Sequence, residues 1–131
     1  MKILCQTERL KIEHEFDTAF LIDKVTGLVL LEDDFYGDPT CGIIHPSNQW
    51  AVIAGEHLVV WTEKETKQIH DDDLKWIHSI RILDSDSVGL LVDPLSEKPA
   101  IWKLNVRSFE YNKLRDFTDY QGQEYQENVN W

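Results

Sequence analysis

The sequence predicts an all-β, mainly antiparallel fold, and three observations support this prediction. Short apolar segments recur along the chain, and clusters of Gly, Pro, Asn, Asp and Ser separate them every few residues. Several of these segments alternate apolar and polar residues, as strands with one solvated face do. The stretch 41–62 holds three apolar runs joined by two tight turns, which is the pattern of a small antiparallel meander.

The middle strand of that stretch is expected to lie at the centre of the fold. Trp50 and Val52 fall on one of its faces, and Ala51 and Ile53 fall on the other. Because both faces are apolar, we expect both to be covered.

The N-terminal region predicts a strand with one buried face. Four residues fall on its apolar side and four charged residues fall on its solvated side: Leu10, Ile12, His14 and Phe16 against Arg9, Lys11, Glu13 and Glu15. The apolar run 3–5 is either the beginning of this strand or a separate one.

A hairpin is expected next, from the apolar runs 19–22 and 28–31 around the loop 23–27. Asp23 can accept hydrogen bonds from the turn amides, and Gly27 can adopt the positive φ that such a loop needs.

The second half of the chain predicts further strands at 75–83, 88–92 and 100–106. In the first of these, Trp76, His78, Ile80 and Ile82 would share a face.

The polar stretch 63–73 is expected to be an exposed connection with at most one helical turn. Residues 108–117 fit a short helix capped by Ser108 and fit a strand nearly as well. The polar tail 118–131 is either disordered or held to the body by its large side chains, Tyr120, Tyr125, Val129 and Trp131.

The whole chain, 1–131, is therefore expected to form a single domain of about eight strands. Short connections favour pairing between neighbours in sequence, which gives a meander or a sandwich. A weak internal repeat, 57–61 and 99–103 with a late Trp in each, resembles strands of WD-repeat propeller blades. A closed propeller needs at least four blades of about 40 residues. The chain is long enough for about three, so a partial propeller is the alternative arrangement.

Charge indicates the class of partner. The chain has 24 acidic and 13 basic residues, for a formal net charge of -11. Such a surface repels nucleic acid and anionic membranes, so we expect it to bind neither directly. It attracts basic proteins and accelerates their encounter. The competing interpretation is that the charge serves solubility alone.

No catalytic motif, cofactor-binding motif or metal site is apparent, and we expect the protein not to be an enzyme. His14 and His78 lie on apolar strand faces, where satisfied core histidines are commoner than catalysts. His45 and His57 are expected to face solvent. The acidic runs 70–73 and 84–87 lack the ligand spacing of a calcium loop, so they are interpreted as solvated turns.

The cysteines and the N-terminus favour the cytoplasm. Cys5 and Cys41 lack the spacing of a zinc or redox motif, and a disulfide between them stays open. The first residues do not form a signal-peptide pattern, and no apolar run approaches the roughly 20 residues that span a bilayer. We therefore expect a cytoplasmic protein with reduced thiols.

What remains is a protein-binding surface in the acidic loops, where aromatic residues accompany the charge. Aromatic anchors inside a charged rim are typical of protein interfaces. The predicted partner-binding residues are five acidic side chains and two aromatic anchors: Asp33, Asp34, Asp71, Asp72 and Asp73, with Tyr36 and Trp76.

In length, charge and motif-free β pattern the chain resembles the immunity proteins of contact-dependent growth inhibition systems. The resemblance implies a cytoplasmic inhibitor that binds a basic toxin domain, often a nuclease, and covers its cationic active site with phosphate-mimicking carboxylates. The alternatives are a small-ligand-binding β-barrel, an uncharacterised enzyme that uses the interior histidines His14 and His78, and an adaptor module. Nothing in the sequence fixes the oligomeric state.

Overall fold

The computed structural model describes residues 1–124 and 129–131, and the described part folds into three four-stranded antiparallel sheets. Within each sheet, strands that follow one another in sequence pair with one another. Sheet 1 contains β1 (Lys2–Gln6), β2 (Leu10–Glu15), β3 (Thr18–Asp23) and β4 (Val29–Asp34). Sheet 2 contains β5 (Cys41–Ile44), β6 (Trp50–Ala54), β7 (Leu58–Thr62) and β8 (Thr66–Ile69). Sheet 3 contains β9 (Ile77–Asp84), β10 (Ser87–Val92), β11 (Ala100–Asn105) and β12 (Tyr111–Asp116).

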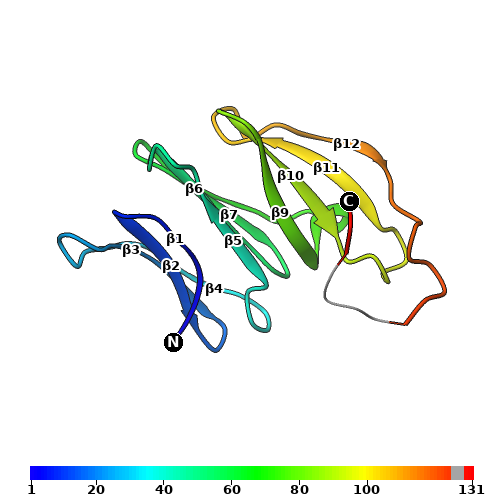
Figure 1. Cartoon of the computed structure of the whole chain (residues 1–131), viewed down its shortest axis with the longest axis horizontal. Coiled ribbons are helices and arrows are strands. Elements are labelled where there is room, and N and C mark those ends of the chain that lie inside the picture. Colours follow the sequence, from blue (N-terminus) through cyan, green and yellow to red (C-terminus); the bar gives the residue numbers. More distant parts are fainter. Residues whose placement is uncertain (125–128) are drawn as a thin grey trace.

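The all-β, antiparallel prediction is confirmed, and the arrangement is the partial propeller. The three sheets follow one another in chain order and lie face to face like blades (Figure 1). Their first strands are adjacent, since β1 contacts β5 and β5 contacts β9. In the described residues no sheet closes into a barrel. None of the described helical structure is long and apolar enough to cross a membrane.

Two edge strands account for much of the difference between the twelve observed strands and the eight expected. β8 lies inside the stretch predicted as an exposed connection. Its first three residues are exposed, so it shows no apolar alternation in the sequence. β12 occupies the segment that also fitted a short helix, and the helix prediction is wrong. Pairing with β11 satisfies the backbone of this polar segment, which has no buried face to stabilise a helix.

Sheet 2 lies in the middle and is covered on both sides, as the sequence predicts. Trp50 and Val52 pack into the core between sheets 2 and 3. Ala51 and Ile53 pack into the core between sheets 1 and 2. Every residue of β6 is buried. The weak repeat also has a structural basis, because Trp61 and Trp102 lie on the third strand of their respective sheets.

The hairpin loop 23–27 forms as its residues predict. The carboxylate of Asp23 accepts hydrogen bonds from the amides of Val25 and Thr26, at 2.9 and 3.2 Å. Gly27 has a φ of +79°, a conformation that a side chain would strain.

The C-terminal tail covers the outer face of sheet 3. Tyr120, Val129 and Trp131 pack against a small core on that face. The guanidinium of Arg81 lies 4.3 Å from the ring centre of Trp131, within range of a cation–π interaction. The tail is therefore pinned where it is described, whereas Tyr125 lies outside the described residues.

Both cysteines are free thiols. Cys5 packs against the core between sheets 1 and 2, and Cys41 packs against the core between sheets 2 and 3. The two thiols thus lie in cores on opposite sides of sheet 2, which explains why they do not form a disulfide.

Cys41 is expected to resist alkylation in the folded protein. Burial raises its pKa to about 12, an effect that the hydrogen bond with Thr40 only partly offsets. Because the thiolate is the nucleophile, iodoacetamide at about pH 8 should modify Cys41 at least about tenfold more slowly in buffer than in urea. Peptide mass spectrometry with Cys5 as internal reference measures this. Equal rates in buffer and urea would show that Cys41 is accessible.

Candidate functional site

Four connections meet at one end of the molecule, called here the loop end: residues 35–40, 55–57, 70–76 and 93–99. In a four-stranded antiparallel meander, the turn between the second and third strands lies at the same end as the connection to the next sheet. Residues 35–40 and 70–76 connect the sheets, and residues 55–57 and 93–99 are such turns within sheets 2 and 3. Backbone hydrogen bonds join these connections directly. Ile77 donates to the carbonyl of Gly55, and Asp93 donates to the carbonyl of Trp76, each at 2.9 Å.

The two predicted aromatic anchors lie side by side at the loop end. The rings of Tyr36 and Trp76 meet edge to face, with their centres 6.2 Å apart. They are 75% and 47% exposed. The sequence separates them by a whole sheet, and the fold brings them together as one aromatic pair on the surface.

Trp76 is held in a strained conformation. Its φ is +56°, which is rare for a bulky residue and costs about 1–3 kcal/mol. It precedes β9 and does not share the strand face that the sequence predicted for it. The flanking hydrogen bonds to Gly55 and Asp93 fix this backbone, so the indole is displayed by a rigid support.

Most of the predicted acidic residues accompany this aromatic pair. Asp72 and Asp73 are exposed on the turn Asp72–Leu74, and Asp34 is exposed where β4 ends. Asp71 caps that turn. The hydroxyl of Tyr111, 2.6 Å away, and then the amide of Asp73 hold the pKa of Asp71 below its ordinary value. Asp71 therefore anchors the acidic turn to β12.

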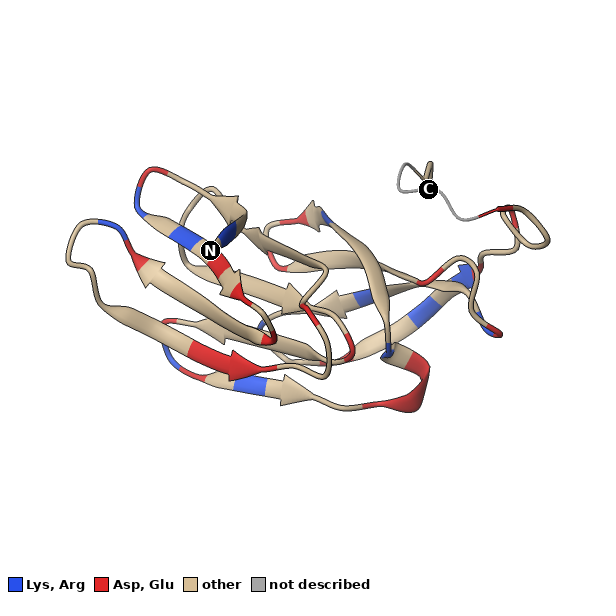
Figure 2. Cartoon of the chain, turned by 90° about the horizontal axis from the view of Figure 1, so that it is seen from below, with Lys and Arg blue, Asp and Glu red and all other residues tan. Residues whose placement is uncertain are grey.

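Further charge on the same end is mainly negative. Its other acidic residues are Asp38, Glu56, Asp93 and Glu97, against the basic residues Lys75 and Lys98. Figure 2 shows Asp and Glu on several of the loops and strand ends. Lys75 lies 3.3 Å from Asp72 in an exposed pair. An open groove of about 350 Å³ runs beside Trp76, and its charged walls are Asp72, Asp73 and Glu97 together with Lys75 and Lys98. The groove therefore carries charges of both signs beside the exposed indole.

Asp33 has a different environment from the other predicted residues. It is only 6% exposed, and its two carboxylate oxygens contact Nε2 of His57, at 2.7 Å, and the side-chain amide of Gln68. Its charge is therefore used inside the protein, between sheets 1 and 2, and is not displayed at the surface.

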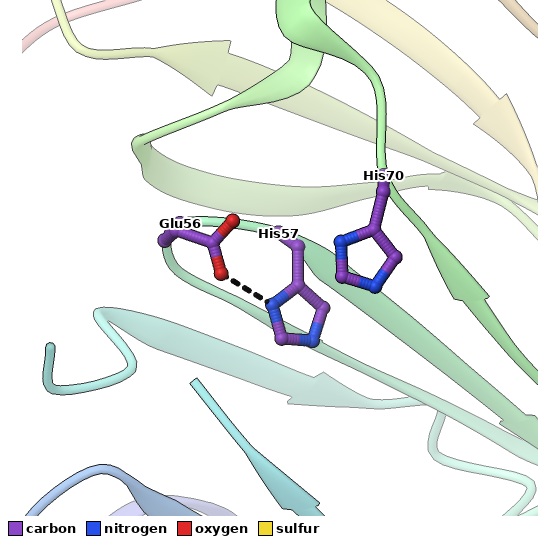
Figure 3. Close-up of side chains that lie close together, drawn as sticks. All are labelled: Glu56, His57 and His70. Carbon is purple, nitrogen blue, oxygen red and sulfur yellow. Dashed lines mark hydrogen bonds and ion pairs between the residues drawn. The ribbon is translucent and has the colours of Figure 1, made fainter. Parts of the chain in front are cut away.

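His57 is the centre of a polar cluster that sequence reasoning missed (Figure 3). The expectation that it faces solvent is wrong, because it is 2% exposed. Its ring is stacked between Phe35 and His70, with ring centres 4.1 and 4.5 Å away. Its Nδ1 lies 2.8 Å from a carboxylate oxygen of Glu56.

The charge on Glu56 is stabilised within this cluster. Burial acts to raise its pKa, but the hydrogen bond and positive charge of His57 and the amide of Tyr36 together bring it below its ordinary value. An ionised carboxylate therefore lies beside the imidazole at the base of the aromatic pair.

The interior histidines predicted for the enzyme alternative do not form a site together. His14 is on β2 of sheet 1, where its Nδ1 lies 3.0 Å from the carbonyl of Phe16. His78 is on β9 of sheet 3, where its Nδ1 lies 2.8 Å from the hydroxyl of Ser79. Sheet 2 stands between them. No protein-family model matches the chain, and neither does any curated protein sequence.

Proposed function

We propose that the chain is an immunity protein, an acidic inhibitor that binds a basic toxin domain and covers its active site with the loop end. The observation that carries this proposal is the exposed Tyr36–Trp76 pair, rigidly supported and surrounded by carboxylates. A nuclease is the favoured partner, because its active site is cationic in order to hold phosphates. The inhibitor acts in the cytoplasm, where such a toxin attacks the cell.

In this mechanism the acidic residues affect the association rate, and the aromatic residues affect the dissociation rate. Exposed ion pairs contribute about 0–1 kcal/mol each, so Asp34, Asp72 and Asp73 act mainly by accelerating and orienting encounter. Aromatic residues buried at the centre of an interface contribute about 2 kcal/mol or more when truncated. Tyr36 and Trp76 therefore determine how long the complex persists. Displaying Trp76 in a fixed conformation reduces the entropy lost on binding.

The test uses two charge-reversal variants with the same net charge. D72K/D73K reverses two exposed carboxylates at the loop end. E63K/E65K reverses two exposed carboxylates in the turn between β7 and β8, at the opposite end. Each variant raises the net charge by the same amount. The partner is first captured with the tagged chain from lysate of the source cells, and its association rate is then measured for each variant.

We expect D72K/D73K to slow association about 10- to 100-fold in roughly 50 mM salt, with the difference shrinking in about 500 mM salt as charges are screened. E63K/E65K should alter the rate less than about threefold, because charges beyond a Debye length of about 10 Å are largely screened. Equal slowing by the two variants would show that only total charge matters and that the loop end is not the interface.

A further inference from the structure

We infer that Glu56, His57 and His70 form a binding site for a zinc-like divalent transition metal ion. This inference is independent of the proposed function. Their nearest ligand atoms, two imidazole nitrogens and a carboxylate oxygen, all lie within 4.8 Å of one another. Among the described residues these three come from two adjoining strand ends and converge at the loop end (Figure 3).

The register of sheet 2 brings the two histidines together. Leu58 at the start of β7 pairs with Ile69 at the end of β8. The residues just outside this pair, His57 and His70, are therefore cross-strand neighbours, and their rings stack. Glu56 precedes His57 in the turn from β6.

Asp33 supplies the support that metal-binding histidines require. Nε2 of His57 lies 2.7 Å from the buried carboxylate of Asp33, so once Nδ1 has given up its proton to bind the ion, Nε2 keeps its own proton and donates it to Asp33. Metal-binding histidines almost always donate their second N–H to such a partner, which fixes the tautomer and the ring orientation. The side chain of Gln68 in turn holds Asp33.

The ligand atoms must move closer together to bind an ion, and the side chain of His70 can make this movement. Zinc–nitrogen and zinc–oxygen distances of about 2.0–2.2 Å place tetrahedral ligand atoms roughly 3.3 Å apart. His57 is held by Phe35 and Asp33, whereas His70 is exposed. Rotation of the His70 ring out of its stacked position brings its nitrogen toward the ion. Metal entry displaces the proton shared by Nδ1 and Glu56, and that proton passes to solvent.

The donor set indicates the class of metal. Two imidazoles and one carboxylate suit Zn²⁺, Co²⁺ or Ni²⁺, whereas Mg²⁺ and Ca²⁺ prefer all-oxygen sites. Three protein ligands leave a fourth position for water or for a group from a partner. Because His70 adjoins the acidic turn, the bound ion would fix the segment that leads to Asp72 and Trp76.

Titration of the full chain with ZnCl₂ by calorimetry, after treatment with EDTA, tests the inference. We expect one Zn²⁺ per chain with a Kd of about 10 μM or tighter, corresponding to roughly -7 kcal/mol. His70→Ala is the informative variant, since the exposed ring can be removed without opening the core. It should weaken binding at least about tenfold, as should Glu56→Gln.

His45→Ala, in the turn between β5 and β6 at the other end, is the matched control and should bind Zn²⁺ as the unaltered chain does. Millimolar Mg²⁺ should not compete. Co²⁺ should give a visible absorption spectrum of tetrahedral coordination that His70→Ala abolishes. Binding unchanged in both His70→Ala and Glu56→Gln, or no binding below about 100 μM, would overturn the inference.

Discussion

Replacing Trp50 with alanine should lower the free energy of unfolding by about 3–5 kcal/mol, as truncation of a buried aromatic residue usually does. Trp50 is fully buried in the core between sheets 2 and 3. Its indole Nε1–H donates to the carbonyl of Ser85 at 2.9 Å, which ties the two sheets together. For a chain whose total stability is about 5–15 kcal/mol, this loss is large.

Urea unfolding followed by far-ultraviolet circular dichroism measures the effect. Trp50→Phe is the matched control, because it keeps most of the apolar volume and loses the hydrogen bond. We expect it to cost about 1–2 kcal/mol, near the value of a lost hydrogen bond and a small cavity. A Trp50→Ala variant within about 1 kcal/mol of the unaltered chain would contradict the packing of sheet 2 against sheet 3.

Asp33→Ala should be destabilising by about 2–3 kcal/mol, because it removes the acceptor of a buried hydrogen bond to His57. The change leaves Nε2–H of His57 without its acceptor between sheets 1 and 2, and it also removes the acceptor of the exposed side-chain amide of Gln68. Buried polar groups without partners are costly because water cannot replace the lost bond. Thermal and urea unfolding of the purified variant give the magnitude.

The neighbouring aspartate provides an unusually close control. Asp34 is exposed and accepts a hydrogen bond from the hydroxyl of Thr18, so Asp34→Ala should stay within about 0.5 kcal/mol. Asp33→Asn keeps an oxygen acceptor for His57 and should lose less than Asp33→Ala. If Asp33→Ala and Asp34→Ala were equally mild, the buried Asp33–His57 link would not contribute to the fold.

Much of the fold could be predicted because the sequence of the central strand has a clear hydrophobic pattern. Apolar residues on both faces of β6 require a sheet on each side, which is what the structure contains. The turn hydrogen bonds of Asp23 and the positive φ of Gly27 likewise follow from local rules. Such features depend on neighbours in sequence and on a clear hydrophobic pattern.

The site was harder to predict because the proximity of its two histidines depends on β8, a strand without a recognisable hydrophobic pattern in the sequence. β8 has three exposed polar residues, so the stretch that contains it has the composition of a connection. Without β8 there is no register to place His70 opposite His57, and the sequence alone presents both as isolated histidines. A β7–β8 hairpin turning at residues 63–65 is the signal that could have revealed the pair. The contact between Tyr36 and Trp76 depends on sheet packing, which no local pattern encodes.

The most direct measurement of the central claim is the activity of the basic protein that the tagged chain captures in low salt. With nucleic acid as substrate, we expect hydrolysis by that protein to stop when the unaltered chain is added at an equimolar ratio. Trp76→Ala should inhibit only at higher concentration, because the loss of a central anchor weakens binding by about 2 kcal/mol or roughly 30-fold. A captured partner whose activity is unaffected by the chain, or a Trp76→Ala variant as potent as the unaltered chain, would contradict inhibition through the loop end.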